Sequence, residues 1–216
     1  MRYTLNEGQQ ILNNLLIEMG KEVERIMVGC MECLITLDKD KVDYWVGEDQ
    51  LINDLEWKID DECVRLIATQ QPVAKDLRKI VSAIRISTDL ERMSDLAVGI
   101  AKTVRRIEGP LCKPLIDIPL MEEKALAMMR MGIEAYRSEN MELARKLAEQ
   151  DDEVDHLCKL VMTDLLAIMT ETPENIAQGI QLIIIGRYLE RFADHATNIG
   201  ESVIYIATAE RTDLNS

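Results

Sequence analysis

The sequence has few aromatic residues and no excess of positive charge. Phenylalanine, tryptophan and tyrosine together make up 4% of the 216 residues, and the net charge at pH 7 is −14. Nucleic-acid binding needs cationic side chains for the phosphates, and single-strand binding adds aromatic stacking. Both deficits argue against a nucleic-acid partner. An acidic chain is better suited to cations, or to a protein partner with a basic surface.

Long apolar runs and a secretion signal are also missing. No stretch approaches the roughly 20 apolar residues that a transmembrane helix needs. The first ten residues, MRYTLNEGQQ, lack the basic start and apolar segment of a signal peptide. We therefore expect a cytoplasmic protein that does not insert into a membrane.

Recognisable catalytic motifs are absent as well. The five cysteines are an odd number, which indicates reduced thiols in a chain without a secretion signal. Cys30 and Cys33 form a lone CxxC inside a helical pattern, which favours apolar helix positions over a zinc or redox site. There is no Ser–His–Asp set and no glycine-rich phosphate loop. We expect no enzyme activity.

The prolines are few and leave long uninterrupted segments, as helices require. Apolar residues recur every three or four positions, for example from Ile11 to Leu37, and no alternating pattern indicates a strand. The predicted fold is therefore all-α. The expected helices lie at about 5–37, 40–70, 73–108, 119–138, 141–170 and 175–209.

A proline-rich segment divides the chain into two similar halves. Three of the five prolines fall in GPLCKPLIDIP, residues 109–119. Each half has two helices, then a proline, then a third helix that carries LERxxD. This repeat predicts two pseudo-symmetric three-helix bundles, residues 1–108 and 119–216, joined by a linker at 109–118.

The repeated motif contains a pair of acidic residues. LERMSDLAVGI (90–100) and LERFADHATNI (189–199) share six of eleven positions. Glu91 and Asp95, and likewise Glu190 and Asp194, are four residues apart and share a helix face. Like charges at this spacing repel each other, and apolar positions flank both pairs. A positive group between the acids would offset the repulsion.

The second helix of each half offers matching oxygen ligands. Aligning its apolar positions places Asp49 on Asp151 and Asn53 on Asp155. If these helices are neighbours, four oxygen-bearing side chains converge in each half. Such a set suits Mg²⁺, Mn²⁺, Ca²⁺ or iron, and suits zinc and copper poorly. Spacing alone favours equally a metal-free ion-pair network with the nearby arginines, which are Arg85, Arg92, Arg187 and Arg191.

With these residues, the chain resembles the PhoU family of phosphate-uptake regulators over nearly its whole length. The resemblance is carried by DLERMSDLAVGIA, YLERFADHATNIGE, CVRLIATQQPVAKDLRKIVSAIRIST and the acidic stretch on the second helix of each half. It implies a PhoU-like, six-helix protein with metal clusters, iron among others.

Transferred by position, the resemblance implies one metal site at Asp49, Glu91 and Asp95, and another at Asp151, Asp155, Glu190 and Asp194. Fe, Mn, Mg and Zn all remain candidate ions. Asn53 stands where the family often has an acid, and Gly99 stands where the other half has Asn198. Both departures make the first site the weaker one.

The resemblance further implies a cytoplasmic negative regulator. Such a protein couples the phosphate ABC importer, through its ATPase, to a membrane-bound sensor histidine kinase, and we expect a homodimer. Direct phosphate sensing is not expected, because an acidic surface repels the anion unless bound metal inverts the local charge.

Two alternatives remain open. Glu153 and His156 form an E-x-x-H motif, as in ferritin-like di-iron enzymes, but that chemistry wants two such motifs and the chain has two histidines in all. The other histidine, His195, follows Asp194, and a helix-face position is favoured over a place beside a site. The second alternative is a metal-free helical adaptor, whose acids form only ion pairs.

Overall fold

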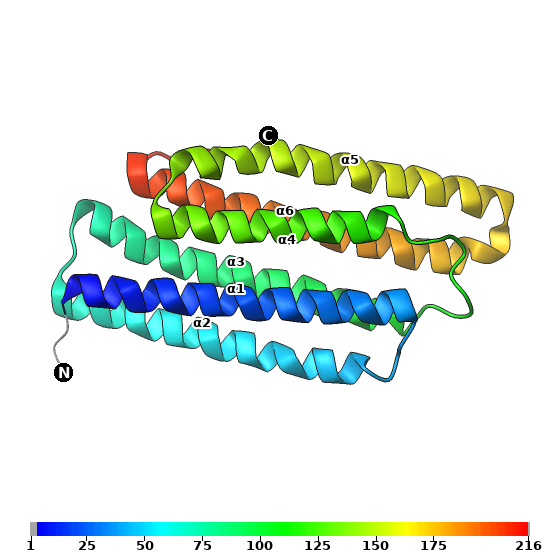
Figure 1. Ribbon diagram of the computed structural model, residues 1–216, viewed down its shortest axis with the longest axis horizontal. Helices are drawn as coiled ribbons and strands as arrows, with labels where there is room; N and C mark the ends of the chain where they lie inside the picture. Colours follow the sequence, from blue (N-terminus) through cyan, green and yellow to red (C-terminus); the bar gives the residue numbers. More distant parts are fainter. Residues whose placement is uncertain (1–3, 216) are drawn as a thin grey trace.

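The structure is a computed structural model that describes residues 4–215 (Figure 1). In this part of the chain six α-helices and one 3-10 turn are present and strands are absent, so the all-α prediction is confirmed. The elements are α1 (Leu5–Thr36), α2 (Val42–Gln70), α3 (Ala74–Val104), α4 (Asp117–Ser138), α5 (Met141–Glu171), η1 (Pro173–Asn175) and α6 (Ile176–Thr208).

The helices form two layers of three. Helices α1, α2 and α3 pack against one another, and α4, α5 and α6 do the same in the second half (Figure 1). The layers meet mainly where α3 lies against α6, with a smaller contact between α1 and α4. This arrangement agrees with two three-helix bundles, while the exact domain boundaries remain a prediction.

The contact between α3 and α6, which we call the seam, is antiparallel. The guanidinium of Arg78 donates to the carbonyl of Ile206 at 2.9 and 3.1 Å, near the start of α3 and the end of α6. Closer to the C-terminal end of α3, Asp89 Oδ1 lies 2.9 Å from Nδ1 of His195, which precedes Ile206 by about three turns of α6. The two copies of the motif therefore run past each other in opposite directions.

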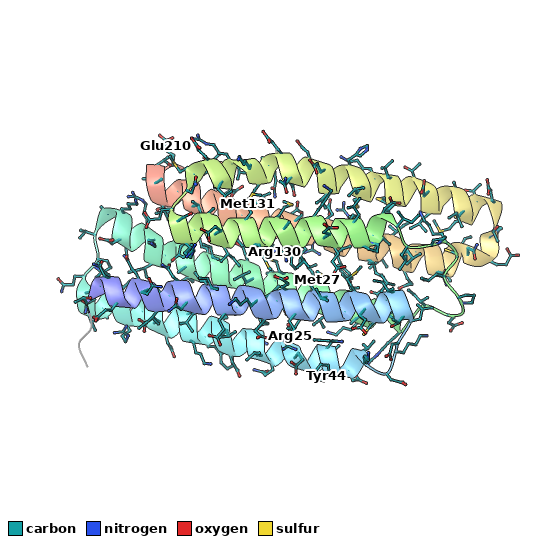
Figure 2. All side chains as sticks on the ribbon, in the orientation of Figure 1. Arg25, Met27, Tyr44, Arg130, Met131 and Glu210 are labelled. Carbon is teal, nitrogen blue, oxygen red and sulfur yellow. The ribbon has the colours of Figure 1, made fainter. Side chains whose placement is uncertain are left out.

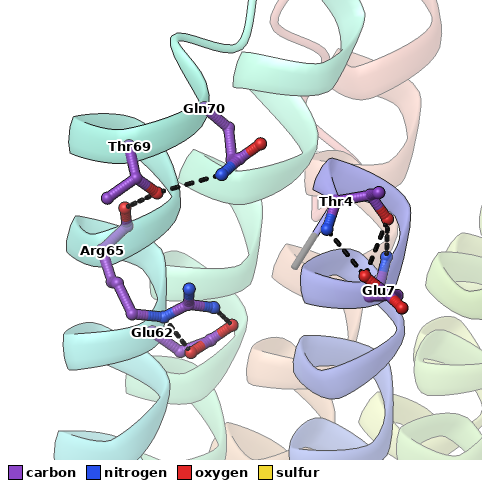
Figure 3. A network of polar contacts seen from close by, with 6 residues as sticks. All are labelled: Thr4, Glu7, Glu62, Arg65, Thr69 and Gln70. Carbon is purple, nitrogen blue, oxygen red and sulfur yellow. Dashed lines mark hydrogen bonds and ion pairs between the residues drawn. The ribbon is translucent and has the colours of Figure 1, made fainter. Parts of the chain in front are cut away.

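Local signals explain where several helices begin and end. Thr4 and Glu7 form a reciprocal capping box at the start of α1, and Figure 3 shows these bonds beside the Glu62–Arg65 ion pair of α2. Asn140 caps α5 by accepting from two backbone amides. Leu37 ends α1 in the left-handed conformation. Its backbone N–H donates hydrogen bonds to the carbonyl oxygens of Cys33 and Leu34 in the last turn of the helix.

The end of α3 differs from the prediction. We expected a helix to residue 108, but α3 ends at Val104. The backbone amides of Arg106 and Ile107 donate hydrogen bonds to the carbonyl oxygens three residues earlier, as in a 3-10 turn. This tighter turn places the side chain of Ile107 in the core, where it is 1% exposed. Gly109 follows with φ +71, which ends any helical continuation.

The interior is filled by apolar side chains from all six helices, while charged side chains cover the outside (Figure 2). Cys30 and Cys33 are buried in α1, and burial raises the pKa of both thiols, as expected for apolar helix positions. None of the helices described here combines the length and the apolar character that a bilayer crossing requires.

Two helical glycines provide a matched test of this packing. A Cβ atom at Gly29 of α1 would lie 2.0 Å from the Trp45 ring, whereas one at Gly47 of α2 would meet nothing within 4 Å. We expect Gly29→Ala to lower the free energy of unfolding by about 1–3 kcal/mol through overpacking. Gly47→Ala should raise it by about 0.5–1 kcal/mol through helix propensity. Urea denaturation measures both, and equal effects would contradict the packing of α1 against Trp45.

Candidate acidic clusters

The second half brings its four predicted acids together. Asp151 and Asp155 lie one turn apart on α5, and Glu190 and Asp194 lie one turn apart on the adjacent α6. Asp151 is only 9% exposed, and no described residue donates a hydrogen bond to its carboxylate. Burial, together with the charges of Asp194, Asp155, Asp152 and Glu190, raises the pKa of Asp151 to about 7. We call these four residues the second acidic cluster.

Glu190 holds the least satisfied oxygen of this cluster. Its Oε1 accepts from Arg187 Nη1 at 2.5 Å, but its Oε2 is buried without a partner among the described residues. Burial raises the pKa of Glu190, the charge of Arg187 lowers it, and the charges of Asp194 and Asp155 raise it again. A buried carboxylate oxygen without a donor costs free energy, so the cluster as it stands is incompletely compensated.

The cations around the second acidic cluster are fewer than its acids. Arg187 pairs with Glu190, and Lys159 pairs with Asp155 at 3.3 Å from an exposed position. Among the described residues Asp194 has no ion-pair partner. Burial, followed by the charge of Asp155, raises its pKa against the weaker opposing charges of His195, Arg187 and Arg191. Two direct partners for four carboxylates leave net negative charge in a partly buried place.

The first half is arranged differently. Asp49 of α2 accepts a hydrogen bond from Ser94 Oγ of α3 at 2.6 Å. Glu91 is partly buried, and burial and then the charge of Asp95 raise its pKa, while Arg92 lowers it. Asp95 itself is 50% exposed at its side chain and lies 3.4 Å from Arg92. These residues, with Glu56 described next, form the first acidic cluster, which is more exposed and better compensated than the second.

Two members of the first acidic cluster were missed by sequence reasoning. Glu56 adds to the charge that raises the pKa of Glu91, and its Oε1 accepts from Thr88 at 3.0 Å. Its spacing from Asp49 and Asn53, at seven and three residues, places all three on one face of α2 and could have revealed it. Ser94 is the other: the matching residue in the second motif is Ala193, which has no hydroxyl to donate.

Neither cluster is arranged as a finished metal site. Among residues 4–215, no three His, Cys, Asp or Glu side chains are placed so that they could hold a metal ion. The donor chemistry of the second acidic cluster nevertheless fits a hard cation, because it offers carboxylate oxygens, one of them buried and unpartnered. The assignment of metal ligands therefore remains a prediction.

The E-x-x-H motif of α5 lies on the outside of the bundle. Glu153 is 53% exposed at its side chain and pairs with Lys124 at 2.5 Å, and His156 is exposed. Ligands of a di-iron site project into the bundle core. The other histidine contacts the neighbouring helix across the seam, where His195 Nδ1 lies 2.9 Å from Asp89 Oδ1.

Comparison with known proteins gives matches over both halves. The sequence model of the family described as PhoU domain matches residues 16–104 and 118–203. A "Phosphate-specific transport system accessory protein PhoU homolog" from Clostridium acetobutylicum is 37% identical over 206 residues, which cover 94% of each chain. A protein of the same name from Rhizobium meliloti is 32% identical over 94% of this chain and 86% of its own.

Solved structures give the same result. The crystal structure of PhoU from Pseudomonas aeruginosa superposes with a TM-score of 0.88 at 32% identity, covering 96% of this chain and all of that one. The crystal structure of the phosphate transport system regulatory protein PhoU from Streptococcus pneumoniae superposes with a TM-score of 0.89 at 27% identity, covering 97% of this chain and all of that one.

The raised pKa of Asp151 predicts how stability depends on pH. The unfolded chain releases this proton near pH 4, while the folded protein holds it up to about pH 7. Between these values the unfolded state binds fewer protons, so this residue lowers stability as the pH rises. In chelator-treated protein, Asp151→Asn should be more stable than wild type at pH 8 by about 1–2 kcal/mol, allowing for solvent screening at the cluster rim. The gain should shrink toward pH 4.

The control for this measurement is Glu149→Gln, which removes an exposed acid of the same helix that is not among the charges raising the pKa of Asp151. Urea denaturation between pH 4 and pH 8 should show that the free energy of unfolding of this variant changes with pH as that of the wild type does. If Asp151→Asn were destabilising at pH 8 in the absence of metal, the carboxylate would have a stabilising partner and the description of the cluster would be wrong.

Proposed function

The chain belongs to the PhoU family, and from that premise we propose that it is an accessory regulator of a phosphate transport system. The observation that carries this proposal is the match of both halves to the family model, together with relatives named as accessory to phosphate-specific transport that cover 94% of the chain. A regulator of this kind associates with a transporter and catalyses no reaction itself. The exposed position of the E-x-x-H motif gives no support to the alternative of a ferritin-like enzyme.

We further propose that the protein acts in the cytoplasm as a negative regulator and couples two membrane-bound partners. These partners are the ATPase of a phosphate ABC importer and a sensor histidine kinase. The net charge of −14 supports this proposal physically, because an acidic helical surface is complementary to basic patches on the cytoplasmic side of such partners. Opposite charges speed and orient docking more than they tighten it.

The same proposal includes metal ions at the acidic clusters. In the second acidic cluster, Asp151, Asp155, Glu190 and Asp194 would hold iron or a divalent ion, which would supply the positive charge that the side chains lack. Asp49, Glu91 and Asp95 would hold an ion in the first cluster, more weakly because Asn53 replaces an acid. The excess of carboxylates and the unpartnered Glu190 Oε2 support this idea. Binding would require the side chains to reorient.

We also propose a homodimer. Helix α2 exposes Trp57 and Val64, each 63% exposed and seven residues apart on one face. Large exposed apolar side chains that share a face are typical of interaction surfaces. A metal-free adaptor would keep this surface and lack only the ions.

Metal binding can be tested by elemental analysis of the purified protein. We expect Glu190→Gln combined with Asp194→Asn to lower the bound metal per chain by at least about half, because the second cluster has the larger carboxylate excess. Glu153→Gln removes an exposed acid and should leave the content unchanged. Addition of Mn²⁺ or Fe²⁺ to chelator-treated wild type should raise the melting temperature. Unchanged metal in the double variant would show that the assigned residues are not the ligands, and the absence of metal from the wild-type protein would favour the adaptor.

The regulatory role can be tested by deletion in the native cell. We expect alkaline phosphatase to be expressed constitutively in high phosphate, because the negative regulator of the starvation response is lost. The wild-type gene should restore repression, and an affinity-tagged copy should copurify with the importer ATPase. Repression that persists after deletion, accompanied by altered iron handling, would contradict the proposal and favour a metalloenzyme.

A further inference from the structure

A groove lies along the seam, lined by residues of α3, of α6 and of the segment that follows α6. It has a volume of about 460 Å³, within the range of small-molecule sites. Helix α3 and the C-terminal part of α6 form its walls, and the segment after α6, where Figure 2 labels Glu210, closes one side. The polar residues that line it include Arg85, Asp89, Asn198, Glu201, Tyr205 and Arg211.

The two arginines of the groove have no acidic partner. Several other arginines of this acidic chain are paired with acids: Arg25 binds Glu22 and Glu48, and Arg130 binds Glu24. In the described part of the chain, Arg211 forms no hydrogen bond or ion pair, and the guanidinium of Arg85 only lies over the Tyr205 ring, 5.4 Å from its centroid. The groove thus presents two guanidinium groups whose donors are available to a ligand.

The two carboxylates of the groove are held by other donors. Asp89 Oδ1 accepts from His195 Nδ1 at 2.9 Å and from Asn198 Nδ2 at 3.1 Å. Glu201 Oε1 accepts from the amide of Leu214 at 2.9 Å. The second oxygen of each carboxylate accepts no hydrogen bond from residues 4–215. These acids therefore do not neutralise the arginines, but they keep a free acceptor each.

The groove is not a general consequence of the duplicated fold. The 99-residue offset between the two motifs relates Asp89 to Tyr188 and Asn198 to Gly99. At that equivalent place a Cβ atom on Gly99 would lie 3.1 Å from the Tyr188 ring, so the aromatic side chain fills the seam. The seam is packed shut at one end and open, with unpaired arginines, at the other.

We propose that this groove binds inorganic phosphate. Guanidinium groups match the geometry and charge of an oxyanion. Near neutral pH phosphate also carries a P–OH group, which can donate to the free oxygen of Glu201 or Asp89. Sulfate has no such proton and would be repelled by both carboxylates. An acidic protein can therefore bind this anion locally without help from a metal, contrary to the expectation from net charge.

The proposal goes beyond the accessory role, because it places a ligand on the regulator itself. The proposal is tested by isothermal titration calorimetry, in which phosphate is titrated into the chelator-treated full chain at constant ionic strength. We expect saturable binding of phosphate, with Arg85→Gln and Arg211→Gln each weakening it by at least about tenfold through loss of a charge-assisted hydrogen bond. The matched control is Arg145→Gln, an exposed and unpaired arginine of α5 outside the groove, which should change the affinity by less than about twofold.

Selectivity separates phosphate from other oxyanions. Sulfate, and glycerol 3-phosphate as a dianion without a P–OH group, should bind more weakly than phosphate. Glu201→Gln should reduce the preference of the groove for phosphate over sulfate, because the glutamine amide can donate a hydrogen bond to sulfate. Thermal unfolding confirms that each variant is folded, and both arginines are exposed and outside the core.

Several outcomes would overturn the proposal. These are the absence of saturable phosphate binding to wild type, equal weakening by Arg145→Gln, and sulfate or glycerol 3-phosphate binding as tightly as phosphate. Copurification with the importer ATPase does not depend on the groove. The titration and the copurification therefore test the phosphate site and the accessory role separately.

Discussion

The packing of α3 against α6 fixes how the two copies of the repeated motif face each other. Both helices carry the repeated motif, and the apolar members of each copy, such as Leu90 and Phe192, are fully buried. Once these residues are in the core, the acids one helical position away must lie at its edge, where water solvates them poorly. The antiparallel direction of the seam then places different ends of the two copies opposite each other.

The clusters differ because each half compensates its acids differently. In the first half, Ser94 donates to Asp49, and Asp95 reaches water and Arg92. In the second half, Ala193 leaves Asp151 without a donor, and its pKa rises to about 7. A buried carboxylate in this state takes up either a proton or a cation. The second half is thus the one where a change in bound metal would alter charge most.

Periodicity and repetition were sufficient to predict the six helices, because a stripe of apolar residues and well-separated prolines constrain a helix locally. The acids of the second cluster could be predicted too, since four-residue spacing fixes a face. The contacts of Asp89 with His195 and Asn198 could not, because they depend on the register of α3 against α6, which no short segment encodes. Likewise, the end of α3 depends on where Ile107 finds its place in the core.

The two ends of the seam differ in a way that folding stability alone does not require. Stability alone would allow both ends of the seam to be packed, as Tyr188 packs against Gly99 at one of them. At the other end, Asn198 donates a hydrogen bond to Asp89, and Arg85 and Arg211 line an open groove without an ion pair among the described residues. Solvated charges facing a groove gain little for the fold. Their arrangement is explained better by a ligand than by packing, and it makes the two halves, alike in backbone, unequal in chemistry.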